Sequence, residues 1–157
     1  MRNLFDQYSQ NENKLTHALV SALHEDRALL KAFLRWATGN RKLPRNIEVI
    51  EQQIVGDDQE PESVADRKGL PDAWFFDDDI WSVLLESKVA ARLTREQLSR
   101  HYSTAIRRGF TDVTVLTITV AEPKIALPDY VVSKTWIDCF GWLKALESTS
   151  LWAGRVA

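Results

Sequence analysis

Two apolar segments joined by an acidic turn constrain the fold of this chain more than any other feature. Residues 71–76 and 80–89 are rich in aromatic and branched aliphatic side chains, and the triplet Asp77-Asp78-Asp79 separates them. Aspartates between apolar runs are typical of turns, because their side chains hydrogen-bond to nearby backbone N–H groups. The pattern predicts an antiparallel β-hairpin whose second arm is long and mostly apolar.

The segment before the hairpin predicts two helices and a strand. Leucines at helical spacing indicate helix over residues 11–38, and Asp26 interrupts their stripe where it could cap a second helix over 27–37. β-Branched residues in the segment 47–55 predict a strand. Residues 56–69 are polar and acidic, which is typical of a loop.

The segment after the hairpin predicts a crossover helix, another strand and a last helix. Thr94 followed by Gln97 has the spacing of a capping box that starts a helix, and Gly109 is suited to end the same helix. The expected elements are a helix at 93–108, a strand at 112–120 and a helix at 135–146. The order predicts an α/β fold with a central mixed sheet of about four strands, flanked by helices.

Composition places the chain among ordinary globular domains. Of the 157 residues, 45% are hydrophobic and 27% are charged, which excludes a disordered, collagen-like or coiled-coil chain and suits one domain over 1–157. The single cysteine excludes an internal disulfide. No secretory leader or long apolar span is visible, so we expect a cytoplasmic protein without membrane contact. The apolar residues 151–157 leave two interpretations open: they dock on this domain, or the chain is the N-terminal domain of a longer protein.

Two carboxylates and a lysine converge on the predicted hairpin. A hairpin centred on Asp79 places Asp72 opposite Glu86, and strand alternation puts Glu86 and Lys88 on one face. Paired carboxylates need a cation, and oxygen ligands suit Mg²⁺ or Mn²⁺. Such a metal activates water and stabilises a phosphate under attack, and the lysine could assist. The alternative interpretation is a hairpin with a surface salt bridge.

These residues resemble the motifs of the PD-(D/E)XK nuclease superfamily over roughly residues 10–120. Pro71-Asp72 is similar to the PD half-motif, and Glu86-Ser87-Lys88 is similar to the ExK half. The segment 11–16 resembles a helix-borne motif whose glutamate, here Glu12, commonly joins the metal site. Gln97 matches a glutamine of the helix after ExK, whereas Tyr102 lies one residue beyond the commoner spacing.

The resemblance implies a restriction-endonuclease-like fold and a metal-dependent nuclease, most simply a DNA endonuclease, and an effector role in phage defence or restriction is one expectation that follows from it. Metal ligands would come from Asp72, Glu86, Glu12 and the backbone carbonyl of Ser87. Lys88 would position the nucleophile or stabilise the transition state, and Gln97 would support the site. The alternative is an inactive module of the same fold that binds nucleic acid or a protein partner.

Charge is distributed unevenly along the chain. Residues 90–110 carry five arginines against one glutamate, whereas residues 48–86 carry 12 acidic and 2 basic side chains. We expect Arg92, Arg95 and Arg100 to hold a nucleic-acid backbone, although a solvated helix face would have the same composition. DNA is the expected partner and RNA remains open. A homodimer or larger oligomer and a C-terminal sensor or partner domain are further expectations.

The remaining reactive and aromatic residues point mainly to structure. The three histidines, His17, His24 and His101, lack the spacing of metal ligands, and His101 is at most a candidate contact for nucleic acid. Cys139 is expected to be a core thiol. The tryptophans Trp36, Trp142 and Trp152 are candidates for an exposed patch used in self-association.

Overall fold

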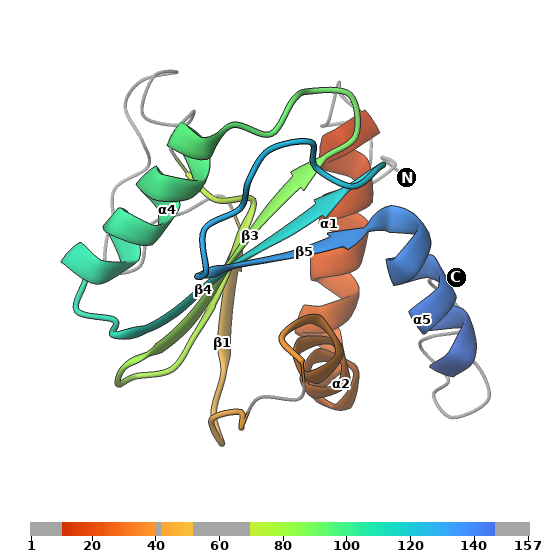
Figure 1. Ribbon diagram of the computed structural model, residues 1–157. Coiled ribbons are helices and arrows are strands. Elements are labelled where there is room, and N and C mark those ends of the chain that lie inside the picture. The colour runs from red at the N-terminus through yellow and green to blue at the C-terminus, as the bar shows by residue number, and fades with distance from the viewer. Residues whose placement is uncertain (1–10, 40–41, 52–69, 147–157) are drawn as a thin grey trace, which may run out of the picture.

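A five-stranded mixed β-sheet with four helices organises the part of the chain that the computed structural model describes, residues 11–39, 42–51 and 70–146 (Figure 1). Of residues 11–13 only the backbone is described. The strands are β1 (Glu48–Glu51), β2 (Ala73–Phe76), β3 (Trp81–Lys88), β4 (Asp112–Thr119) and β5 (Val131–Thr135). The helices are α1 (Asn11–Glu25), α2 (Arg27–Ala37), α4 (Arg95–Arg107) and α5 (Trp136–Leu146).

The strands lie in the sheet in their order along the chain. The pairs β1–β2 and β2–β3 are antiparallel, whereas β3–β4 and β4–β5 are parallel. Helix α4 forms the crossover between the parallel strands β3 and β4, as the sequence predicts. The α/β class and the mixed sheet are therefore confirmed.

The fifth strand corrects the prediction of about four strands. Val131–Thr135 pairs in parallel with β4 at the edge of the sheet, and α5 begins at the next residue. Strand β5 was not predicted because it is short, is only partly buried and runs directly into a helix without a turn. Its two adjacent valines were the available signal.

Helices cover both faces of the sheet. Strand alternation sends Phe75, Val83 and Leu85 into one core, where they meet residues of α1, α2 and α5. Trp74 and Leu84 point to the other face, where they pack with residues of α4 and with Phe110. Figure 1 shows this division, with α4 on one side of the sheet and α1, α2 and α5 on the other.

The predicted helix ends are confirmed where the structure describes them. Asp26 separates α1 from α2, and its carboxylate accepts hydrogen bonds from the N–H groups of Ala28 (2.8 Å) and Leu29 (3.0 Å). Gly109 follows α4 with a φ of 96°, a conformation that glycine adopts without steric cost. The predicted strand over 47–55 is observed at Glu48–Glu51, and its second half lies outside the described residues.

Trp36 and Trp142 are partly buried where α2 meets α5, so the exposed patch that would also include Trp152 stays a prediction. Trp36 and Trp142 stack on each other with ring centroids 5.3 Å apart, and both pack on Phe33 between α2 and α5. The ammonium of Lys134 lies over the Trp36 ring. The two rings thus pack in the contact between α2 and α5, and Trp152 lies outside the described residues. None of the described helices has the length and apolarity that crossing a membrane requires.

Candidate active site

The register of the hairpin brings Asp72 to Glu86. Ala73 pairs with Leu85, as expected for a hairpin centred on Asp79. The next pair in the same register is Asp72 with Glu86, so these two residues lie opposite each other. The Asp72 N–H donates to the Leu85 carbonyl at 2.9 Å. The Asp72 carboxylate in turn accepts a 2.7 Å hydrogen bond from the Ser87 N–H. The carboxylate of Asp72 is therefore fixed on the backbone of β3 beside Glu86.

Glu86 is the centre of a cluster of polar side chains in the core. Only 3% of the residue is exposed. Its Oε1 lies 2.6 Å from Lys88 Nζ and accepts from Gln97 Nε2 at 3.4 Å, while its Oε2 lies 2.8 Å from His101 Nε2. Lys88 shares a strand face with Glu86, and Gln97 and His101 are one helical turn apart on α4. The strand and the helix thus converge on one carboxylate.

The surroundings of Glu86 keep it ionised. Burial alone would raise the pKa of this carboxyl, but the hydrogen bond and charge of His101, followed by the charge of Lys88, outweigh burial and lower the pKa. A buried carboxylate that stays charged is an effective ligand for a cation and an effective anchor for an ammonium group.

The capping box at the start of α4 is formed in part. Thr94 Oγ1 accepts from the Gln97 N–H at 3.3 Å, as predicted. The Gln97 side chain makes two contacts: its Oε1 accepts from the Thr94 hydroxyl at 3.4 Å, and its Nε2 donates to Glu86 Oε1 at 3.4 Å. The cap therefore fixes the helix start and the Gln97 side chain, whose amide nitrogen reaches the site.

The donor types suit a hard divalent cation, although the described ligand set is small. Asp72 and Glu86 supply carboxylate oxygens, each with more than one lone pair, and Ser87 supplies a backbone carbonyl. Among the described residues, no group of three or more His, Cys, Asp or Glu side chains is arranged to hold a metal ion. Any third carboxylate must therefore come from outside the described side chains.

Glu12 is the third carboxylate that the sequence predicts, and its side chain lies outside the described part. Its backbone belongs to the first turn of α1. Helix α1 packs on the face of the sheet opposite α4. Its N-terminal end lies toward the same end of the molecule as the arrowheads of β3 and β4 (Figure 1). A role for Glu12 in the site stays a prediction.

The three predicted nucleic-acid contacts differ in position. Arg92 is exposed in the loop after β3 and lines a cleft together with Lys88. Arg95 and Arg100 are exposed on α4 and do not line that cleft. Of the three arginines, Arg92 is thus the one that the structure brings next to the Glu86 cluster.

His101 is the site residue that the sequence analysis missed. Only 2% of it is exposed, so it cannot serve as a surface contact for nucleic acid and instead holds Glu86. The available signal was its spacing of one turn from Gln97, which puts both on the inner face of the helix. Tyr102 instead packs with the core on the α4 side and stacks on Tyr130, with ring centroids 4.0 Å apart.

The other reactive residues have structural surroundings. His17 Nδ1 lies 2.9 Å from a Glu51 oxygen, which joins α1 to β1, and His24 is exposed. Cys139 is buried in α5, and its burial raises the pKa of the thiol to about 12. The expectation of a core thiol is confirmed.

Comparison of the chain with protein-family models, with curated proteins and with solved structures finds no match. The resemblance to PD-(D/E)XK nucleases therefore rests on the sequence motifs.

Proposed function

We propose that this protein is a metal-dependent nuclease of the PD-(D/E)XK type, with a restriction-endonuclease-like fold. The observation that supports this most is the contact of Lys88 Nζ with Glu86 Oε1 at 2.6 Å, where Asp72 lies opposite Glu86 one register step beyond the Ala73–Leu85 pair. A glutamate and a lysine of β3 thus meet beside the aspartate that directly precedes β2. An ordinary surface salt bridge does not account for a carboxylate that is buried from solvent.

Asp72, Glu86 and the Ser87 carbonyl would hold Mg²⁺ or Mn²⁺, with Glu12 as a further ligand. When bound, such an ion supplies charge stabilisation on a phosphate and lowers the pKa of water. The oxygens of Asp72 and Glu86 are directed by hydrogen bonds from the Ser87 N–H, His101 and Gln97. These bonds hold the carboxylates in place before any substrate arrives, which reduces the reorganisation needed during the reaction.

Lys88 is the proposed catalytic cation. Its ammonium is held by Glu86, and its side chain also reaches the cleft formed by the loops after β3 and β4. From there it orients the attacking water or neutralises charge that builds on the phosphate. His101 and Gln97 act through Glu86 and are positioning residues.

DNA is the proposed substrate, with RNA as the alternative, and Arg92, Arg95 and Arg100 place exposed cations for either backbone around the loop and helix that follow Lys88. Cations that contact phosphates give affinity without reading sequence. We therefore propose weak sequence preference.

A second function is favoured by one observation. Both oxygens of Glu86 are already bound, to Lys88 and Gln97 and to His101, and the described side chains include no three-ligand group. This arrangement would also suit a module that keeps the fold and binds nucleic acid or a protein without hydrolysis.

Cleavage of supercoiled plasmid, with an RNA transcript in parallel, separates the two functions. The protein is incubated with Mg²⁺, with Mn²⁺ or with EDTA, beside Asp72→Asn and its matched control Asp78→Asn, an exposed aspartate of the same hairpin. The nuclease proposal expects product from wild type and Asp78→Asn, and none from Asp72→Asn or in EDTA. Binding of either substrate without product in both metals would support the second function.

A further inference from the structure

A basic cleft of about 580 Å³ opens beside the Glu86 cluster. Its volume lies within the range of roughly 300–1,000 Å³ that is usual for sites of small organic ligands. The residues that line it are Lys88, Val89, Ala91, Arg92, Leu93, Thr119, Val120, Ala121, Pro123, Lys124 and Ile125. Lys88 belongs to both the cluster and the cleft, so a ligand in the cleft would lie next to the proposed catalytic cation.

The cleft lies where the two parallel strands end. Lys88 is the last residue of β3 and pairs with Thr119, the last residue of β4. The loops that follow these strands supply the rest of the lining, and Figure 1 shows them beyond the arrowheads of β3 and β4. The crevice outside the carboxyl ends of parallel strands is the usual place for ligands in α/β sheets.

The charge of the cleft is complementary to an anion. Its described lining includes the cations Lys88, Arg92 and Lys124 and no acidic side chain. Neither Arg92 nor Lys124 makes an ion pair with another residue of the described part. Glu122 is exposed in the same loop as Lys124 but does not line the cleft. Lys88 is bound to Glu86, so within the described part Arg92 and Lys124 are the cations of the cleft that can receive a negatively charged ligand.

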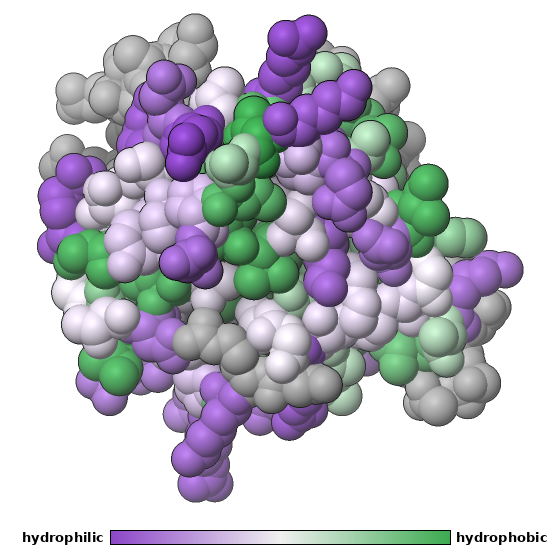
Figure 2. Space-filling model, in the orientation of Figure 1, coloured by the Kyte–Doolittle hydropathy of each residue, from purple (hydrophilic) through white to green (hydrophobic). Residues whose placement is uncertain are grey.

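The walls of the cleft are apolar. The lining includes Val89, Leu93, Val120, Pro123 and Ile125 besides the cations, and Val120 is 51% exposed. In Figure 2, hydrophobic and strongly hydrophilic side chains adjoin at the end of the molecule where these loops lie. A free phosphate would use the charges and leave the apolar walls without a partner. The lining instead fits a ligand with an anionic group and a flat organic body.

We propose that the cleft holds one unpaired nucleotide of the substrate, with its phosphates on Arg92 and Lys124 and its sugar and base against the apolar walls. This inference rests on the proposed nuclease function and specifies its substrate as a strand that is single or frayed at the cut. A base inside a duplex is stacked and paired, and it cannot enter a cleft unless it is extruded at the cost of that stacking and pairing. The described lining has no aromatic side chain for stacking, so preference among bases is weak.

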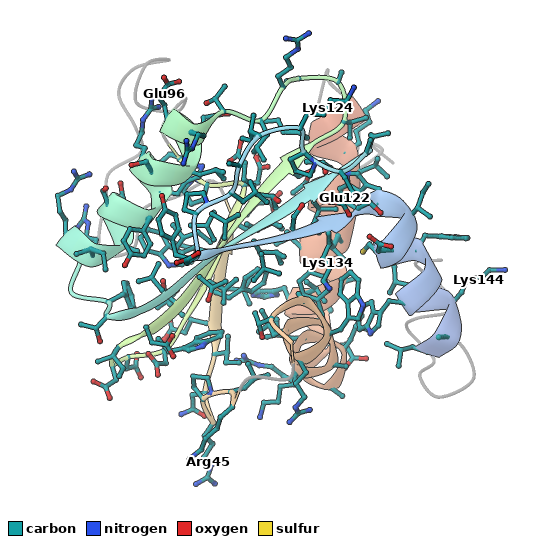
Figure 3. All side chains as sticks on the ribbon, in the orientation of Figure 1. Arg45, Glu96, Glu122, Lys124, Lys134 and Lys144 are labelled. Carbon is teal, nitrogen blue, oxygen red and sulfur yellow. The ribbon has the colours of Figure 1, made fainter. Side chains whose placement is uncertain are left out.

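The charge contribution is tested by fluorescence anisotropy in EDTA, with a labelled single-stranded DNA and the matching blunt duplex. The variant is Arg92→Ala/Lys124→Ala, and its charge-matched control is Arg45→Ala/Lys144→Ala. Arg45 and Lys144 lie away from Lys124, with Arg45 at the opposite end of the molecule (Figure 3). The loss of two phosphate contacts should reduce the salt slope, which is the slope of log binding constant against log salt concentration, by about 1.4. Single-strand binding should weaken about 25-fold near 0.1 M salt.

The cleft itself is tested with a variant that fills it without a change of charge. Ala121→Trp narrows the cleft, and Ala145→Trp on the exposed face of α5 is its control. The proposal expects Ala121→Trp to weaken single-strand binding at least tenfold, with duplex binding and the salt slope unchanged. A mononucleotide should also compete better than inorganic phosphate. Equal competition by the two, or equal loss of single-strand and duplex binding in Ala121→Trp, would overturn the inference.

The two proposals fail separately. Binding in EDTA requires no hydrolysis. If the binding results are as expected but no metal-dependent product forms, the nuclease proposal is contradicted and the proposed nucleotide cleft still stands. Metal-dependent cleavage that is equally fast on single and double strands, with Ala121→Trp fully active, would contradict the cleft and leave the nuclease.

Discussion

His101 Nε2 lies 2.8 Å from Glu86 Oε2, and both residues are almost completely buried. Glu86 belongs to β3 and His101 to α4, so this bond joins the sheet to the crossover helix at the candidate active site. A hydrogen bond to a charged group contributes roughly 1.5–3 kcal/mol, and a buried charge without its partner is destabilising. The pair is therefore both a structural contact and the support of a proposed ligand.

Replacement of His101 should destabilise the protein, and most strongly where the new side chain cannot donate a hydrogen bond to Glu86. We expect His101→Ala to lower the free energy of unfolding by about 2–4 kcal/mol, because it removes the bond and leaves a cavity. His101→Gln can return an N–H to the position of Nε2 and should cost clearly less. Urea denaturation measures both values.

The control for this series is His24→Ala, which removes an exposed histidine of α1 and should change stability by less than about 0.5 kcal/mol. If His101→Ala were as stable as His24→Ala, the bond to Glu86 would not contribute to the fold.

Stability should depend on the ionisation of Glu86 in acid. Burial alone would raise the pKa of Glu86, but its contacts with His101 and Lys88 lower the pKa below its ordinary value of 4.5. The unfolded chain therefore takes up this proton first as the pH falls. The contribution of Glu86 is fully present above the unfolded pKa and is lost as the pH falls through the folded pKa.

Urea denaturation between about pH 6 and pH 3 measures this dependence. The free energy of unfolding of wild type should fall more steeply below about pH 4.5 than that of Glu86→Gln, which has no carboxyl to titrate. Parallel curves for the two proteins would show that the pKa of Glu86 is not lowered by folding.

Much of the architecture could be predicted because it depends on local patterns. The apolar arms around Asp77-Asp78-Asp79 determined the hairpin, and their symmetry about Asp79 determined which residues pair. Strand alternation then placed Glu86 and Lys88 on one face. These relationships follow from sequence spacing alone, which is why the core of the candidate site was accessible without a structure.

The remaining features depend on packing between distant segments. His101 meets Glu86 only because α4 crosses back over β3, and no spacing in the sequence encodes the angle of that crossing. The pairing of Trp36 with Trp142 likewise depends on how α2 and α5 approach each other. Strand β5 depends on pairing with β4, because its own five residues are too few for a clear periodic signal.

The cap between the first two helices should make a measurable contribution to stability. The Asp26 carboxylate accepts from the N–H groups of Ala28 and Leu29, which the helix leaves without partners. We expect Asp26→Ala to cost about 1 kcal/mol and Asp26→Ser, which retains a capping oxygen, to cost less. Thermal or urea denaturation compares the two, and equal losses would mean that the side-chain oxygen has no capping role.

The most direct test of the account is the single-turnover rate of DNA cleavage by Lys88→Gln, measured in excess Mg²⁺ beside wild type and Lys144→Gln. Lys144 is an exposed lysine of α5, so its replacement controls for the loss of one positive charge. Circular dichroism at the assay temperature establishes that all three proteins are folded. The account predicts that Lys88→Gln is slower than wild type by about 100-fold or more, that Lys144→Gln cleaves at the wild-type rate, and that EDTA stops all cleavage. Cleavage by Lys88→Gln at the wild-type rate, or cleavage that continues in EDTA, would contradict it.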